Sequence, residues 1–204
     1  MKDQEIEVKF YIANLPALEK RLLENGAVLV QARVHETNLR FDTPGRELSN
    51  QFRVLRLRQD TQARMTYKSP RDSIGGTRVR QEIEFTVEDF EAAKALLEAL
   101  GYQVSMAYEK YRTTYDLEDV YVTLDELPYG NFAELEGPHP EAIRAVNARL
   151  KLDWEARSPE SYTVLFERLR VVYGLQFRDL LFENFVQLQV RPEDMIAPRA
   201  ESPR

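Results

Sequence analysis

The chain of 204 residues contains no cysteine and only two histidines, His35 and His139. The first absence excludes disulfides, thiolate nucleophiles and zinc–thiolate sites, and so few imidazoles exclude a histidine-rich metal centre. Any metal must therefore be held by carboxylates. Oxygen ligands of this kind favour hard cations such as Mg²⁺, Mn²⁺ or Ca²⁺ over zinc or copper.

Long apolar runs are missing too. Charges interrupt every apolar stretch well before the ~20 residues that a membrane helix needs, and the N-terminal segment 1–5 is polar and charged. We therefore expect a soluble cytoplasmic protein, a monomer or homodimer, with no membrane partner. The net charge of −6 argues against nucleic acid as a partner, because that binding needs a basic surface.

The length suits one domain, which we place at residues 1–190. Apolar and polar residues alternate with the period of a half-buried strand at 5–12, 54–59, 64–68, 78–86, 108–115, 120–125 and 132–136, and less regularly at 28–41. Helical patterns occupy 15–25, 88–100 and 140–150, and a fourth begins at Ser158 and Pro159. The proline-rich and charged segment 191–204 predicts a disordered tail.

A weak internal repeat relates the two halves of the chain. The segments EIE at 5–7 and LLENG at 22–26 resemble EIE at 82–84 and LLEALG at 96–101. Each half would then be β-α-β followed by a hairpin. Two such halves supply eight strands, about the number at which an antiparallel sheet closes into a barrel with a small lumen. The fold class is therefore α+β.

One face of these strands is almost entirely ionised, whereas the opposite face is apolar. For any single strand the simpler interpretation is a charged face in bulk water. Across successive strands that interpretation weakens, because the charged face is rich in arginine rather than lysine and is sorted into acidic and basic pairs. Paired arginines suit planar oxyanions. If the sheet closes with this face inward, the crowded charges need metals or an anionic ligand as partners.

The ordered motifs resemble those of the CYTH superfamily, also called triphosphate tunnel metalloenzymes. EIEVK at 5–9 is similar to the opening ExExK motif of that superfamily. The later elements follow in the right order: FDTP at 41–44, LRLR at 55–58, TYK at 66–68, EIE at 82–84, KYR at 110–112, LD at 124–125 and GNFAELE at 130–136. The superfamily includes class IV adenylyl cyclases, thiamine triphosphatases and inorganic triphosphatases.

The resemblance implies a closed eight-stranded antiparallel barrel with helices packed outside and a triphosphate bound in its lumen. The implied substrate ligands are Lys9, Arg56, Arg58, Lys68, Lys110 and Arg112, and Arg80 on the same face joins them. Lys9, Lys68 and Arg112 are expected to take part in catalysis. The implied ligands for Mg²⁺ or Mn²⁺ are Glu5, Glu7, Asp125, Glu134 and Glu136, with Glu82 and Glu84 in support.

Three functions remain open at this stage. A metal-dependent hydrolase would release orthophosphate from tripolyphosphate or an organic triphosphate. A class IV-type adenylyl cyclase would make cyclic AMP and pyrophosphate from ATP, and a non-catalytic module would only bind polyphosphate or nucleotide. Val54 stands where animal thiamine triphosphatases tend to place a tryptophan, which argues against thiamine triphosphate. Ser161 and Tyr162 resemble an element that follows the barrel, and we expect Tyr162 to be a core residue outside the site.

Overall fold

The computed structural model describes residues 4–70, 72–74, 77–195 and 200. Its strands are β1 (Gln4–Tyr11), β2 (Val28–Asp42), β3 (Val54–Gln59), β4 (Ala63–Lys68), β5 (Asp72–Ile74), β6 (Thr77–Val87), β7 (Gln103–Leu117), β8 (Val120–Leu127), β9 (Gly130–Glu136) and β10 (Arg157–Ser158). Its helices are α1 (Leu15–Glu24), α2 (Glu47–Asn50), α3 (Phe90–Ala99), α4 (Pro140–Arg149) and α5 (Tyr162–Tyr173), with the short 3-10 helices η1 (Trp154–Ala156), η2 (Phe182–Phe185) and η3 (Pro192–Met195).

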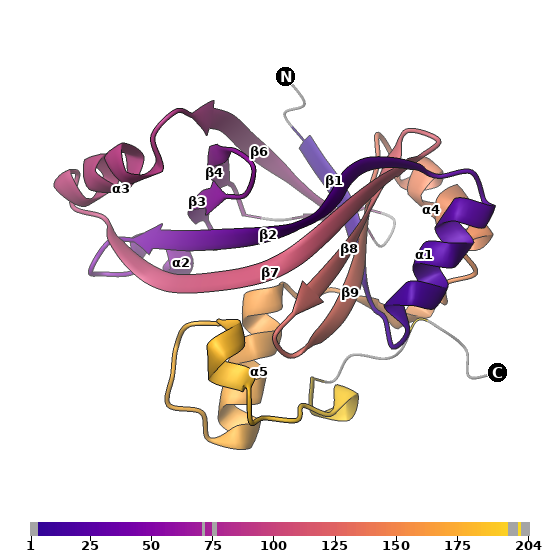
Figure 1. The fold of residues 1–204 in the computed structure, drawn as a ribbon. Helices are drawn as coiled ribbons and strands as arrows, with labels where there is room; N and C mark the ends of the chain where they lie inside the picture. The colour runs from indigo at the N-terminus through magenta and orange to yellow at the C-terminus, as the bar shows by residue number, and fades with distance from the viewer. Residues whose placement is uncertain (1–3, 71, 75–76, 196–199, 201–204) are drawn as a thin grey trace.

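The strands form one antiparallel sheet that closes on itself (Figure 1). Its order is β1-β9-β8-β7-β2-β3-β4-β6, and β6 returns to pair with β1 through Glu5 opposite Arg80. The short strands β5 and β10 extend the sheet beside β6 and β1. The predicted α+β fold, a closed eight-stranded barrel with helices outside, is therefore confirmed.

The two halves of the chain have the same order of main elements, β1-α1-β2-β3-β4 and β6-α3-β7-β8-β9. The corresponding helices begin alike. The Asn14 side chain accepts a hydrogen bond from Ala17 N at 3.0 Å, and Asp89 accepts one from Ala92 N at 2.9 Å. Each cap satisfies an N–H group that has no partner inside its helix. Gly26 and Gly101, with φ of +83° and +90°, follow the two helix ends.

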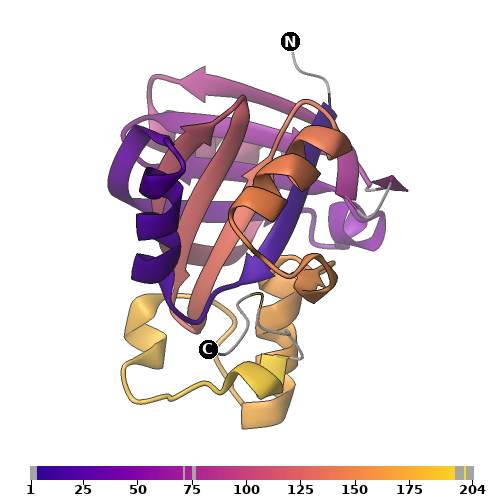
Figure 2. The ribbon, with the colours of Figure 1, turned by 90° about the vertical axis from the view of Figure 1, so that its right-hand side faces the viewer.

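The apolar face of the strands points out of the barrel, and helices cover much of it. In Figure 2, α1 and α4 cross the same side of the barrel. Leu18 and Leu22 of α1 and Ile143 of α4 pack there with strand residues such as Phe10, and all four are completely buried. Burying a side chain of this size stabilises the fold by roughly 1.5–3 kcal/mol. This outer packing turns the alternate residues inward.

Helix α5 and the segments that follow it lie below the barrel in Figures 1 and 2. The N-cap of α5 is Ser161, whose side chain accepts from Val164 N at 3.3 Å, and not Ser158, which lies in β10. Within the predicted tail, η3 packs on α5 and Met195 is completely buried, whereas residues 196–199 and 201–204 lie outside the described part of the chain. In the part that is described, every helix is too short or too polar to cross a membrane.

Candidate active site

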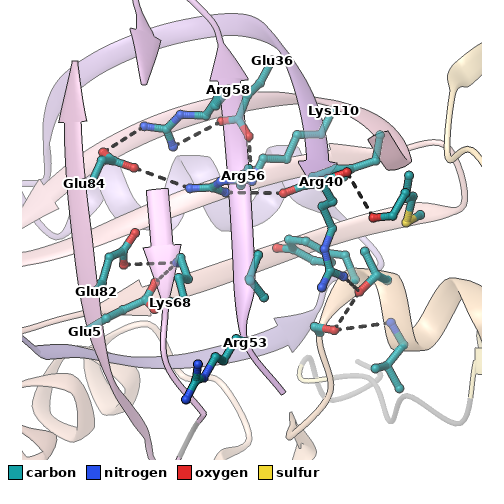
Figure 3. Close-up of a pocket in the computed structure, with 18 of the residues that line it drawn as sticks. Glu5, Glu36, Arg40, Arg53, Arg56, Arg58, Lys68, Glu82, Glu84 and Lys110 are labelled. Atoms are coloured by element: carbon teal, nitrogen blue, oxygen red, sulfur yellow. Dashed lines mark hydrogen bonds and ion pairs between the residues drawn. The ribbon is translucent and has the colours of Figure 1, made fainter. Parts of the chain in front are cut away.

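A cavity of about 1470 Å³ occupies the lumen of the barrel and extends toward α5. Most of the residues predicted for the site line it: Glu5, Glu7, Lys9, Arg56, Arg58, Lys68, Arg80, Glu82, Glu84, Lys110, Arg112, Glu134 and Glu136. Asp125 does not line the cavity and is completely buried. The ionised face of the strands therefore points inward rather than into bulk water. Figure 3 shows part of this lining.

Glu5 of β1 is paired with Lys68 of β4 and with Arg80 of β6, which are neighbouring strands of the barrel. Lys68 Nζ lies 2.7 Å from Glu5 Oε1 and 3.1 Å from Glu82 Oε2, and Arg80 Nε lies 2.7 Å from Glu5 Oε2. Burial disfavours the charged form of Glu5, but Lys68 and Arg80 outweigh it and hold the pKa of this carboxyl well below its usual range. Glu5 is therefore ionised and fixed in place.

A second group joins β7, β8 and β9. Arg112 Nε and Nη2 each lie 2.6 Å from an Asp125 oxygen, and Nη2 is also 2.6 Å from Glu134 Oε2. Lys9 Nζ lies 2.9 Å from Glu134 Oε1, and Lys110 Nζ lies 3.1 Å from Asp125 Oδ2. Both carboxylates thus accept charged donors from two side chains. Burial opposes the ionisation of Glu134, yet Lys9 and Arg112 lower its pKa well below the ordinary value.

Arg56 and Arg58 of β3 share Glu84 of β6 across the intervening strand β4. Arg56 Nη2 lies 3.5 Å from Glu84 Oε2, and Arg58 Nη2 lies 3.3 Å from Glu84 Oε1. In the described part of the chain, the buried Nε atoms of both arginines have no hydrogen-bond acceptor. A buried donor without a partner is unfavourable, and an anion in the cavity would supply the missing acceptor.

Carboxylates crowd together at the β1–β9 edge of the lumen. Glu7 and Glu136 are opposite each other in the register of β1 and β9. Burial, then Glu5 and Glu7, raise the pKa of Glu136 to about 7. This excess of acidic oxygens suits a hard divalent cation. Among the described residues no three acidic or histidine side chains already surround one point, so substrate oxygens or water would have to complete the shell.

Several residues of the site were not expected from the sequence. Glu36 and Asn38 of β2 are buried, and Asn38 Nδ2 donates to Glu36 Oε1 at 2.9 Å. Lys110 Nζ lies 3.6 Å from the same Glu36 oxygen. The alternation of β2 could have revealed both residues, but register shifts near its beginning obscure the period. Trp154 does not line the cavity, whereas Val54 does.

Tyr162 is both a core residue and part of the site. Its hydroxyl donates to Asp125 Oδ2 at 2.7 Å, and Lys9 Nζ lies 3.7 Å from the centre of its ring. Its ring also packs edge-on against the ring of Phe132, with the two ring centres 5.1 Å apart. The expectation that Tyr162 packs in the core is right, but its hydroxyl and ring face also support Asp125 and Lys9. This tyrosine ties α5 to the charged lumen.

Removing only the hydroxyl of Tyr162 tests this link. We expect Tyr162→Phe to lower the free energy of unfolding by about 1.5–3 kcal/mol at pH 7, the range for a hydrogen bond to a charged group. Urea unfolding measures the change. Tyr102→Phe is the matched control, since no hydrogen bond of its hydroxyl is found in the described part of the chain, and its effect should stay within about 0.5 kcal/mol. Equal effects of the two substitutions would contradict the assignment.

Comparisons with known proteins agree with this geometry. The CYTH domain model matches residues 3–157. A Methanocaldococcus jannaschii protein named as a candidate adenylate cyclase is 30% identical over 151 residues, which cover 72% of this chain and 82% of that protein.

Two solved structures share the fold. A candidate adenylate cyclase from Vibrio parahaemolyticus superposes with a TM-score of 0.73 at 22% identity, over 82% of this chain and 99% of that one. A Hippeastrum protein, described as a candidate adenylyl cyclase with a dominant triphosphatase activity, superposes with a TM-score of 0.62 at 19% identity, over 80% and 95%. At these identities the likeness concerns the fold.

Proposed function

The chain belongs to the CYTH domain family, and from that premise we propose that it is a metal-dependent hydrolase that releases orthophosphate from a triphosphate. The observation that carries the proposal is the pair of buried Nε donors on Arg56 and Arg58, two residues that line the cavity; neither donor has a hydrogen-bond acceptor in the described part of the chain. A linear triphosphate offers several oxyanions in a row and suits such donors.

The basic side chains bind the phosphates in this proposal. Arg56 and Arg58 are the primary contacts because their Nε atoms have unused hydrogen-bonding capacity. The other proposed substrate ligands also pair with carboxylates: Lys9, Lys68, Arg80, Lys110 and Arg112. These pairs keep the cations extended into the lumen and reduce their mutual repulsion. Lys9, Lys68 and Arg112 would offset the charge that develops on the transferred phosphoryl group.

We assign Glu5, Glu7, Glu134 and Glu136 to the cation, because all of them line the cavity. Bound Mg²⁺ or Mn²⁺ would polarise phosphate oxygens and make the attacking water more acidic. Asp125, expected from the sequence to be a ligand, is better assigned as a positioning residue, since it is completely buried outside the cavity lining, where its oxygens accept from Arg112, Lys110 and Tyr162. Glu82 and Glu84 orient Lys68 and the β3 arginines.

Adenylyl cyclase activity is the second candidate, and the name of the M. jannaschii relative favours it. The same lumen would then hold ATP with its ribose 3′-hydroxyl directed at the α-phosphorus, and pyrophosphate would leave. Membership of the family does not distinguish attack on the terminal phosphorus, as in the hydrolase, from attack on the α-phosphorus, as in the cyclase. A non-catalytic binding module is the third candidate.

A substrate panel separates the three candidates. The protein is incubated with Mg²⁺ or Mn²⁺ and, separately, with tripolyphosphate, thiamine triphosphate or ATP, and the products are identified by mass. We expect orthophosphate, with turnover abolished by EDTA and restored by excess metal. Cyclic AMP with pyrophosphate would favour the cyclase instead. Binding without any product would leave only the binding module.

A further inference from the structure

Arg40 of β2 lines the cavity where the lumen meets α5, and it is not among the residues predicted for the site. In the barrel register it is opposite Arg56 of β3 and Met106 of β7. Figure 3 shows its side chain in the pocket beside the labelled Arg56. The alternation of β2 turns Glu36, Asn38 and Arg40 to the same inner face.

Arg40 differs from the proposed phosphate ligands in its partners. Each of those ligands has a carboxylate oxygen within 4.0 Å. Within the described ranges, the guanidinium of Arg40 has no such carboxylate, and its side-chain hydrogen bond goes from Nη1 to the hydroxyl of Thr163 in α5 at 2.9 Å. A hydroxyl fixes the direction of the guanidinium but does not neutralise its charge.

The nearest acidic residue on the same strand is already engaged. Asp42 accepts hydrogen bonds from the backbone N–H groups of Thr43 and Leu48 at 2.9 Å and of Ser49 at 3.0 Å. These bonds hold α2 against the end of β2. Burial and the neighbouring Arg56 lower the pKa of Arg40 by more than Tyr108 and Asp42 raise it. An anion in this part of the cavity would therefore be favoured electrostatically.

We propose that Arg40, oriented by Thr163, binds an anionic phosphate oxygen of the substrate at the α5 side of the cavity. This inference rests on the proposed triphosphate function, which it extends by one substrate-binding residue. The planar guanidinium would add a hydrogen-bonded cation beside Arg56. The rival interpretation is that Arg40 only fastens α5 to β2.

Kinetics with tripolyphosphate and Mg²⁺ test the proposal. Arg40→Gln should raise KM roughly 10- to 100-fold, as expected for a lost charged hydrogen bond, with a smaller change in kcat. Arg40→Lys retains the charge without the planar fork and should raise KM roughly 3- to 10-fold. Arg33→Gln is the control, because Arg33 pairs with Glu126 away from the cavity and should leave both constants unchanged.

Thermal unfolding without substrate separates the two interpretations. If Arg40 binds substrate, Arg40→Gln should leave Tm unchanged or raise it, since a partly buried charge beside Arg56 is removed. A fastening role predicts a lower Tm for Arg40→Gln and for Thr163→Val, together with an unchanged KM. That combination would overturn the proposal.

Calorimetry with tripolyphosphate in EDTA distinguishes a failure of this inference from a failure of the proposed function. If the wild-type protein binds tripolyphosphate without any turnover in Mg²⁺, the hydrolase proposal falls, and weaker binding by Arg40→Gln still supports the contact. Equal binding by the two proteins overturns the contact alone. Absence of binding by the wild-type protein overturns both.

Discussion

Replacing Arg112 with methionine is expected to lower the free energy of unfolding by about 3 kcal/mol at pH 7, the lower end of the range for breaking a buried ion pair. The guanidinium holds both oxygens of Asp125 and one of Glu134 at 2.6 Å, and Asp125 is completely buried. Methionine fills a similar volume but leaves these charges with fewer donors. Lys110 and Lys9 still contact the two carboxylates, which is why the lower end applies.

Urea unfolding of the full chain measures this loss, with Arg33→Met as the matched control. Arg33 also pairs with a carboxylate, Glu126 at 2.7 Å, but half of its side chain is exposed, so its removal should change stability by less than about 1 kcal/mol. Asp125→Asn combined with Arg112→Met should lower the free energy of unfolding by less than the sum of the two single substitutions, because the unpaired charge of Asp125 is removed. Similar losses for Arg112→Met and Arg33→Met would refute the buried-network assignment.

The barrel was predictable because most of its strands carry a regular two-residue period. The expected strand at 54–59 has the same bounds as β3. The strand expected at 64–68 begins one residue after β4, and the one expected at 78–86 is one residue shorter than β6 at each end. Inward and outward faces follow directly from that period once the sheet closes. Because most charged inner residues lie on these regular strands, most of the cavity lining was predictable as well.

The pairing inside the lumen was not predictable from the sequence. Lys68 and Glu5 are 63 residues apart and meet only because β6 closes the barrel against β1. Glu36 and Arg40 were missed because register shifts interrupt the period of β2. Tyr162 was set aside because helical spacing shows a buried aromatic but gives no sign that its hydroxyl reaches Asp125. The metal, the reaction and the role of each predicted ligand stay predictions that the experiments above test.

Replacing Glu136 with glutamine is expected to stabilise the metal-free fold and weaken metal use at the same time. Burial, Glu5 and Glu7 raise the pKa of this carboxyl from 4.5 to about 7 in the folded chain. Below pH 4.5 it is protonated in both the folded and the unfolded chain and has no effect on stability. Between pH 4.5 and 7 the unfolded chain loses its proton first, so the folded state becomes less stable as the pH rises.

Above pH 7 both chains are ionised, and the penalty on the folded state stays at its maximum. Glu136→Gln should therefore raise the free energy of unfolding in EDTA by up to about 3 kcal/mol at pH 8, with the gain disappearing toward pH 4.5. Urea unfolding at several pH values measures the gain. Glu24→Gln on the exposed side of α1 should change stability by less than about 0.5 kcal/mol throughout.

The same substitution should raise the Mg²⁺ or Mn²⁺ concentration needed for half-maximal turnover roughly 10- to 100-fold. A carboxylate that destabilises its own fold at neutral pH is explained if a cation neutralises it in the working enzyme. A cation site at Glu136 therefore predicts both the gain in stability without metal and the higher metal requirement. If Glu136→Gln left metal use unchanged, or if its effect on stability did not vary with pH, the acidic side chains at the β1–β9 edge would not be the cation site.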